Sequence, residues 1–184
     1  KFKILTAISV FYDLENPNNF LRDISKIIDK KSGIFLLEHA DLYSIIKHNL
    51  FDTICHEHLT YYSSKIIINM AKRNNLRIID IERNDINGGS TRFYFSHNDS
   101  LYKEKKEKIS NFLKVEKKTK LENSDTFKKF FQKILRLKTS LNKSIDRIIE
   151  NKKIIHGYGA STKGNVLLQF YGIGRKKINF IADR

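Results

Sequence analysis

The chain has 184 residues, of which 40% are hydrophobic and 11% aromatic. This apolar content excludes an intrinsically disordered protein, because such chains cannot bury enough surface to fold. The formal net charge of +15 could indicate a nucleic-acid or anionic-membrane partner. However, most basic residues are Lys spread along a chain rich in Ile and Asn, so compositional preference explains the charge, and we expect neither partner.

The single cysteine, Cys55, excludes an intramolecular disulfide and favours a reducing, cytoplasmic location. No apolar run approaches the roughly 20 residues of a membrane-spanning helix. Both ends of the sequence, 1–10 and 178–184, have the character of core strands, and there is no initiator Met. We therefore expect an internal fragment of a longer protein.

The first half of the chain alternates strand and helix signals, which predicts an α/β fold. Strands are expected at 2–10, 34–37, 77–82 and 91–97, and helices around 20–28, 42–48 and 64–73. This order is that of the closing half of a doubly wound sheet ending in an antiparallel hairpin. Such sheets bind ligands at the carboxyl ends of their strands, where 11–13, 38–41 and 51–62 are expected.

Residues 101–150 combine mixed charges with apolar residues at helical spacing, which predicts two solvated helices with one apolar face. A basic membrane-surface helix is the alternative, but the Lys residues are interleaved with Glu and Asp. The tail restarts an α/β unit, with a strand at 152–156, a glycine-bearing turn at 157–165 and a helix at 166–170.

The tail turn reads Gly-x-Gly-x-x-x-x-Gly, which is neither the dinucleotide fingerprint nor the Walker loop. A glycine turn that opens a helix exposes backbone amides and favours an anion, and Lys163 adds a full charge. The alternative is a turn that uses glycine only for tight packing.

The densest chemistry lies in Phe51–Tyr62, which holds two histidines, two acids, a thiol and two phenols. Four interpretations compete. A metal site would lack enough ligands, because the other histidines are scattered. A Cys55 nucleophile would lack an orienting partner, because adjacent residues rarely face each other. An acid–base pair of Glu57 and His58 and a purely structural hydrogen-bonded loop both remain open on the residues alone.

Three motifs, 51–62, Asn87-Gly-Gly-Ser90 and 157–165, occur in one order and at spacings that resemble the S-adenosylmethionine-dependent sugar C-methyltransferases. The resemblance implies three parts: residues 1–100 as the second half of a class I methyltransferase Rossmann-like domain, 101–150 as a helical connection, and 151–184 as the start of a second Rossmann-like, substrate-binding α/β domain. In that family a zinc-binding domain and the glycine-rich donor loop come earlier, so zinc is expected only outside this chain, and the chain alone is expected to be inactive.

By this resemblance, Glu57 and His58 form the catalytic pair, and the histidine removes a proton from the carbon next to the ketone of a nucleotide-linked keto sugar. The resulting enolate attacks the methyl group of S-adenosylmethionine and needs a hydrogen-bond donor for its oxygen, for which His56, Tyr61 and Tyr62 are candidates. The chain departs from the family at Cys55, where several members carry tyrosine, and at 12–13, where several carry histidine.

The remaining expected contacts fall into two groups. The methyl donor is expected to contact the end of the first strand, namely Ser9, Val10 and Phe11. The nucleotide sugar is expected to contact the two glycine turns, namely Asn87, Gly88, Gly89, Ser161, Thr162, Lys163 and Asn165. The alternative function is a sugar-nucleotide-binding module without catalysis.

Overall fold

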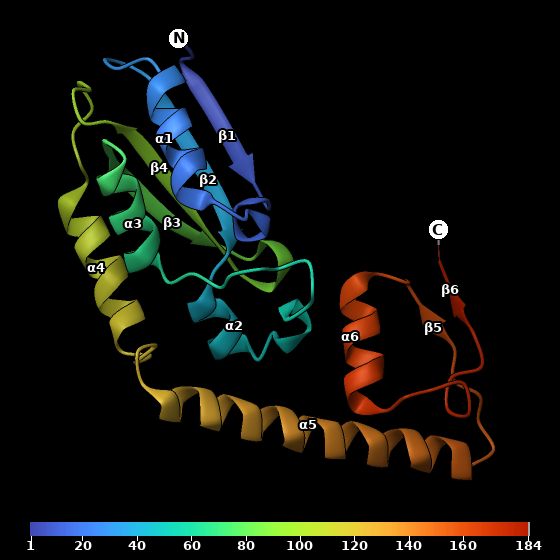
Figure 1. Cartoon of the computed structure of the whole chain (residues 1–184). Helices are drawn as coiled ribbons and strands as arrows, with labels where there is room; N and C mark the ends of the chain where they lie inside the picture. Colours follow the sequence, from blue (N-terminus) through green and yellow to red (C-terminus); the bar gives the residue numbers. More distant parts are fainter. Residues whose placement is uncertain (184) are drawn as a thin grey trace.

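The computed structural model describes residues 1–183 and contains a four-stranded sheet (Figure 1). Its strands lie in the order β1 (Ile4–Ile8), β2 (Ile34–Ala40), β4 (Ser90–His97) and β3 (Leu76–Asn84). β1 pairs with β2 in parallel, whereas β4 runs antiparallel to both of its neighbours. The predicted mixed α/β fold and its antiparallel hairpin are therefore confirmed. The second strand of the hairpin, β4, lies between β2 and β3.

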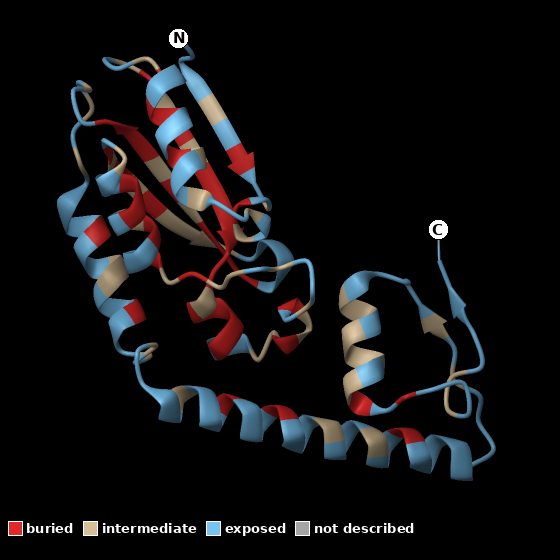
Figure 2. Cartoon of the chain, in the orientation of Figure 1, coloured by how far each residue is buried: buried red, intermediate tan, exposed pale blue. Residues whose placement is uncertain are grey.

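One face of the sheet is covered by α1 (Pro17–Ile27), α3 (Ser64–Arg73) and α4 (Lys106–Lys117) (Figure 1). Their apolar sides share one buried core with the inward-facing strand residues, and Figure 2 shows this buried layer between the helices and the sheet. Along β1, apolar residues lie on both faces of the sheet. Ala7 is buried, whereas Ile4 and Ile8 on the other face are 70% and 56% exposed. The second face of the sheet is thus apolar but open along β1.

The strand β2 extends further than predicted, and this changes the position of two polar residues. Glu38 and His39 belong to the strand and are buried, instead of following it at the ligand-binding edge. Glu38 accepts a hydrogen bond from the Arg92 guanidinium at 2.6 Å, and the His39 ring stacks on Phe93. Asp41 caps the following helix, α2 (Leu42–His48), by accepting from the Ser44 amide at 2.8 Å.

The N-terminus of α3 is capped by a residue from another helix. Ser63 is the N-cap residue, as predicted, but its side chain makes no capping hydrogen bond. Instead the Glu116 carboxylate of α4 accepts from the Ser64 amide at 2.9 Å and from the Ser64 hydroxyl at 2.6 Å. A carboxylate at a helix N-terminus satisfies free amides and complements the helix dipole. This interaction joins α4 to α3.

The two helices predicted within 101–150 are confirmed as α4 and α5 (Ser124–Glu150), which are both largely exposed on one side. α5 buries Phe130, Ile134 and Ile145 in a second core, which it shares with α2 and α6 (Thr162–Tyr171). Figure 1 shows α5 running below the sheet unit and then below α6. The long helix therefore connects the sheet to the tail.

The tail differs from the prediction in its boundaries. Residues 152–156 form no strand; the strands are β5 (Gly157–Tyr158) and β6 (Ile181–Ala182), which pair in parallel. The helix begins at Thr162, four residues earlier than expected, because the Ser161 hydroxyl caps it by accepting from the Gly164 amide at 3.2 Å. Part of the predicted glycine turn is thus the first turn of α6.

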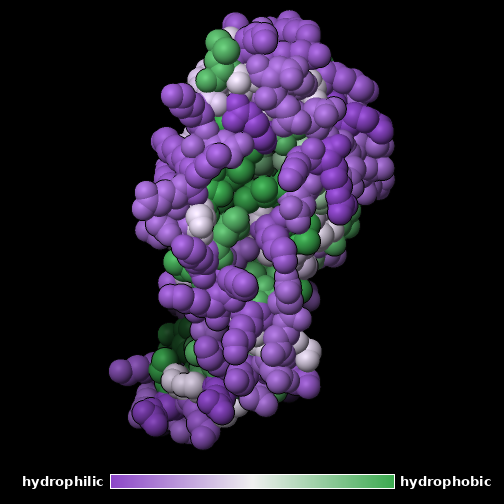
Figure 3. Space-filling view, turned by 90° about the vertical axis from the view of Figure 1, so that its left-hand side faces the viewer, coloured by the Kyte–Doolittle hydropathy of each residue, from purple (hydrophilic) through white to green (hydrophobic). Residues whose placement is uncertain are grey.

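The surface seen from the left-hand side of Figure 1 is mainly hydrophilic, and its apolar side chains gather in a central strip (Figure 3). Within residues 1–183, none of the helices combines the length and apolarity that crossing a bilayer requires.

We predict that stability falls as the pH is lowered from 7 to 5, in part because of His39. Burial lowers the pKa of His39, so its ring stays neutral in the folded state, while the unfolded chain binds a proton below about pH 6.5. Urea unfolding at several pH values should show a smaller loss of stability for His39→Leu than for the unmodified chain. His156→Leu, which changes an exposed histidine, should lose as much stability between pH 7 and 5 as the unmodified chain does. If the free energy of unfolding falls equally with pH in all three proteins, the prediction is contradicted.

Candidate functional site

The loop between α2 and α3 is held at the carboxyl end of β1. The amides of Leu59 and Thr60 both donate to the Tyr12 carbonyl, at 3.0 and 3.2 Å. Tyr12 lies in the short 3-10 turn Phe11–Asp13, which follows β1 after two residues. The loop that carries Glu57 and His58 therefore lies at the sheet edge where the sequence predicts ligand binding.

His58 lies among phenols and a carboxyl group. Its ring centroid is 4.1 Å from that of Tyr12 and 6.3 Å from that of Tyr61. Burial raises the pKa of the Asp13 carboxyl, while the neighbouring His58 lowers this pKa and Glu57 raises it. His58, Asp13 and Glu57 thus interact electrostatically in one small region.

Glu57 is contacted by the tail of the chain. The Thr162 hydroxyl, at the start of α6, donates to Glu57 Oε1 at 3.3 Å across 105 residues of sequence. His56 Nε2 lies 3.8 Å from the same oxygen, but the His56 side chain is 87% exposed. Two of the three motifs identified in the sequence therefore meet at the Glu57 carboxylate.

An aromatic cluster brings these two motifs together. The ring centroid of Phe51 lies 5.2 Å from those of both Phe170 and Tyr171 at the end of α6. Beside this cluster a cavity of about 440 Å³, open to solvent, lies between the loop and α6. Its lining is partly apolar and partly polar, and consists of Ile54, Cys55, His56, Val166, Gln169 and Phe170.

Cys55 is a half-buried thiol in the wall of this cavity. Burial raises its pKa, and a hydrogen bond with Glu57 raises it further. A thiol that stays protonated at neutral pH is a poor nucleophile, which argues against covalent catalysis by Cys55. Among the described residues, no three His, Cys, Asp or Glu side chains gather closely enough to hold a metal ion.

The other residues predicted near the reacting atoms differ in accessibility. The Tyr61 hydroxyl donates to the Thr53 carbonyl at 3.4 Å, and Tyr62 is 5% exposed in the sheet core. Phe11 is fully buried in the same core, whereas Val10 is partly exposed. Ser9 adopts a left-handed conformation with φ of 55°, and its amide donates to the Glu38 carbonyl. Of the three residues expected to contact the methyl donor, Val10 is therefore exposed, Ser9 is half-buried and Phe11 is enclosed.

The Asn87-Gly88-Gly89 turn packs against α2. Asn87, Gly88 and Gly89 all have positive φ values, of 55°, 86° and 142°. A Cβ on Gly89 would lie 2.7 Å from the Ser44 Cβ, and one on Gly88 would lie 3.0 Å from the Leu50 side chain. The side chains nearest to this turn thus belong to α2 and to Leu50, which follows it.

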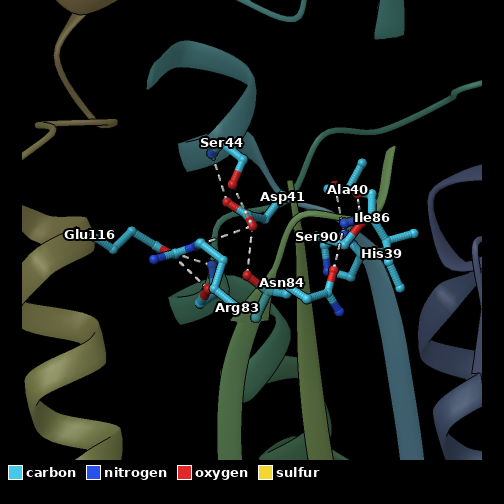
Figure 4. A network of polar contacts seen from close by, with 11 residues as sticks. His39, Ala40, Asp41, Ser44, Arg83, Asn84, Ile86, Ser90 and Glu116 are labelled. Atoms are coloured by element: carbon cyan, nitrogen blue, oxygen red, sulfur yellow. Dashed lines mark hydrogen bonds and ion pairs between the residues drawn. The ribbon is translucent and has the colours of Figure 1, made fainter. Parts of the chain in front are cut away.

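The polar network beside this turn connects β2, α2, β3 and α4. Figure 4 shows Asp41 between Ser44 and Arg83, with Arg83 extending toward Glu116. The Asp41 carboxylate accepts from the Thr91 hydroxyl at 2.6 Å, and Arg83 lies 3.5 Å from Asp41 and 3.7 Å from Glu116. These contacts hold the N-terminus of α2 in place, and the 51–62 loop follows this helix in the chain.

The sequence gives weak signals for two residues that the structure brings to the site. The sequence predicts Tyr12 at the sheet edge, and the structure adds its contact with the His58 ring. Thr162 was expected to contact the nucleotide sugar, and the structure additionally places it on Glu57. The available signal for Tyr12 was its position soon after a buried strand, which is where functional residues of α/β sheets occur.

We predict that Gly89→Ala destabilises the chain by more than about 1 kcal/mol. Alanine is strained at φ of 142°, and its methyl group would clash with Ser44. Gly174→Ala is the matched control, because that position has no positive φ and a Cβ there would meet open space. Urea unfolding should separate the two variants; equal free energies of unfolding would show that α2 moves to accept the methyl group.

Comparison with known proteins identifies two similarities. The family model described as the C-methyltransferase C-terminal domain matches residues 85–184. The chain is also 27% identical over 173 residues to the C-methyltransferase NovU of Streptomyces niveus. That alignment includes 94% of this chain and 41% of the relative, so the chain spans less than half of the relative's length. The resemblance found in the three motifs is confirmed.

Proposed function

The chain belongs to the C-methyltransferase family that shares this C-terminal domain, and we propose that it carries the acid–base site of a C-methyltransferase acting on a nucleotide-activated keto sugar. The methyl group would come from S-adenosylmethionine and would be transferred to the carbon next to the ketone. The observation that carries the proposal is the meeting of Glu57, His58 and the start of α6 at the carboxyl end of β1.

His58 is suited to the role of base. A neutral imidazole accepts a proton near neutral pH, and Glu57 and Asp13 provide negative charge close to the imidazolium that forms. The C–H bond next to the ketone breaks, its proton goes to the imidazole, and its electron pair forms the enolate. The enolate carbon then forms the new C–CH₃ bond as the C–S bond of the donor breaks and its electron pair returns to sulfur.

The end of β1 provides one wall for the methyl donor. Val10 is partly exposed there, and the left-handed Ser9 turns the backbone away from the strand. When bound, the donor supplies an electrophilic methyl group on a sulfonium. The unpaired edge of β1 and its exposed Ile4 and Ile8 support a further proposal, that this sheet is the second half of a Rossmann-like methyltransferase domain, with further strands beside β1.

The start of α6 and the adjacent cavity suit the two ends of a nucleotide. The free amides at the N-terminus of α6 and the Lys163 ammonium favour phosphate groups. The cavity lined by Ile54, His56 and Phe170 offers apolar and aromatic surface for a flat base. A sugar attached to those phosphates would then lie beside Glu57, which Thr162 links to the same helix end.

We predict that His58→Gln in the full-length protein abolishes both methyl transfer and deuterium exchange at the carbon next to the ketone. Glutamine preserves polarity and approximate size but cannot act as a base. Exchange should be followed by NMR and transfer by mass spectrometry of the product. His48→Gln, which changes an exposed histidine on α2 outside this site, should retain both rates. Exchange that persists in His58→Gln would reject His58 as the base.

We also predict that Lys163→Gln weakens binding of a nucleoside diphosphate sugar by about 10-fold or more, because one charge-assisted contact to phosphate is worth about 1.5–3 kcal/mol. Isothermal titration calorimetry at low and high salt would measure this. Lys143→Gln, on the surface of α5, is the charge-matched control and should bind as the unmodified protein does. Equal affinities for the two variants would place the phosphates elsewhere.

The anion-favouring start of α6 also supports a second candidate, a sugar-nucleotide-binding module without catalysis. The same calorimetry separates the two functions. Binding of the sugar nucleotide, together with no binding of S-adenosylmethionine and no exchange by the full-length protein, would favour the binding module.

A further inference from the structure

We propose that the Tyr12 phenol is the hydrogen-bond donor that holds the enolate oxygen in this site. The proposal rests on the function proposed above and assigns a catalytic role to a residue outside the 51–62 motif. A developing enolate oxygen needs a preorganised donor, because its negative charge appears only during the reaction. The question is which side chain beside His58 can supply an O–H or N–H.

Tyr12 is positioned more firmly beside His58 than any other donor described around that ring. Its ring centroid lies 4.1 Å from that of His58, the shorter of the two aromatic distances to this histidine. Its carbonyl accepts the amides of both Leu59 and Thr60, which directly follow His58. The base and the phenol are therefore held together through their backbones as well as their rings.

The chemical state of Tyr12 suits a donor. Burial raises the pKa of its phenol, and the charge of Asp13 raises it further, so the hydroxyl keeps its proton at neutral pH. A side-chain hydrogen bond from Ser9 opposes this rise. When Ser9 donates to the phenol oxygen, the phenol O–H is free to donate onward, and such chains strengthen each bond. Ser9 is the residue held in the left-handed conformation, which is a feature common at functional sites.

The competing donors are less suitable on the same criteria. The Tyr61 hydroxyl already donates to the Thr53 carbonyl, and Tyr62 is enclosed in the sheet core. The His56 side chain is 87% exposed, so water would compete for its N–H groups. Cys55 is only a weak donor. Tyr12 alone among these combines partial burial, contact with the base and a hydroxyl without a described acceptor.

In the proposed step, His58 removes the proton while the Tyr12 O–H donates to the carbonyl oxygen and stays bonded to it as the enolate forms. The phenol keeps its proton throughout, so no further acid or oxidant is required. The interaction strengthens as charge accumulates on the oxygen, and the loss of one such donor typically lowers kcat by about 10²–10³-fold.

The test is Tyr12→Phe in the full-length protein, with a nucleotide-linked keto sugar as the probe. The ring that packs on His58 is kept, and only the hydroxyl is removed. We expect deuterium exchange and methyl transfer to fall together by about 10²-fold or more, while KM changes by less than about 3-fold. Tyr102→Phe is the matched control, because that hydroxyl donates to the Ser32 carbonyl away from the site, and should leave both rates unchanged.

A second measurement separates a catalytic phenol from one that only supports the fold. Replacing Tyr12 by a fluorinated tyrosine lowers the pKa of the phenol, and should shift the alkaline limb of the exchange rate to lower pH. Suppose that the unmodified protein exchanges and methylates normally. An unchanged rate in Tyr12→Phe, or an unshifted pH profile in the fluorotyrosine protein, would then overturn this inference but not the proposed function. If the unmodified protein shows neither deuterium exchange nor methyl transfer, the proposed function and this inference are both overturned.

Discussion

The packing of Phe51 against Phe170 and Tyr171 is the interaction on which the site depends. Phe51 begins the loop that carries Glu57 and His58, and the two other rings end the helix that begins at Thr162. Burial of aromatic surface is the strongest contribution that a small second core can make to stability. The single Thr162 hydrogen bond to the Glu57 carboxylate is exposed, so this aromatic packing and the core that α2, α5 and α6 share hold the start of α6 near Glu57.

The two members of the Glu57–His58 pair have different supports. His58 is held by Tyr12, on the sheet side, whereas Glu57 is held by Thr162, on the tail side. A relative movement of the two units would therefore change the orientation of the pair. The cavity lies between the same two units, with residues of the 51–62 loop on one side and of α6 on the other.

Much of this arrangement follows from the local sequence. The alternation of apolar strands and amphipathic helices up to His97 predicts the elements and the hairpin, and the polar density of 51–62 identifies the loop. Contacts between distant residues could not be predicted from one sequence. The Tyr12–His58 contact spans 46 residues and depends on two backbone hydrogen bonds to one carbonyl. The early start of α6 depends on Ser161, whose capping role was hidden within a glycine-rich pattern.

The Arg83 network holds α2, β3 and α4 together. Hydrophobic contacts alone tolerate sliding, whereas a guanidinium has fixed directions. Arg83 lies over the Tyr43 and Phe112 rings, at 4.0 and 4.2 Å, and between the Asp41 and Glu116 carboxylates. Glu116 in turn caps α3, and burial raises the pKa of its carboxyl while the hydrogen bonds from Ser64 oppose that rise.

Because Glu116 lies at the end of α4, this network sets the direction in which the chain leaves toward α5. The direction of α5 then sets where α6 can pack. The Asn142 side-chain amide of α5 donates to the Tyr171 backbone carbonyl at 2.9 Å, and the Lys177 ammonium donates to the Asn142 side-chain oxygen Oδ1 at 2.7 Å. Two separate sets of polar contacts thus support this arrangement, one around Arg83 beside α2 and α4, and one around Asn142 between α5 and the end of α6. The contacts of Phe51 with Phe170 and Tyr171 join the 51–62 loop to α6, so the positions of this loop and of the start of α6 are determined together.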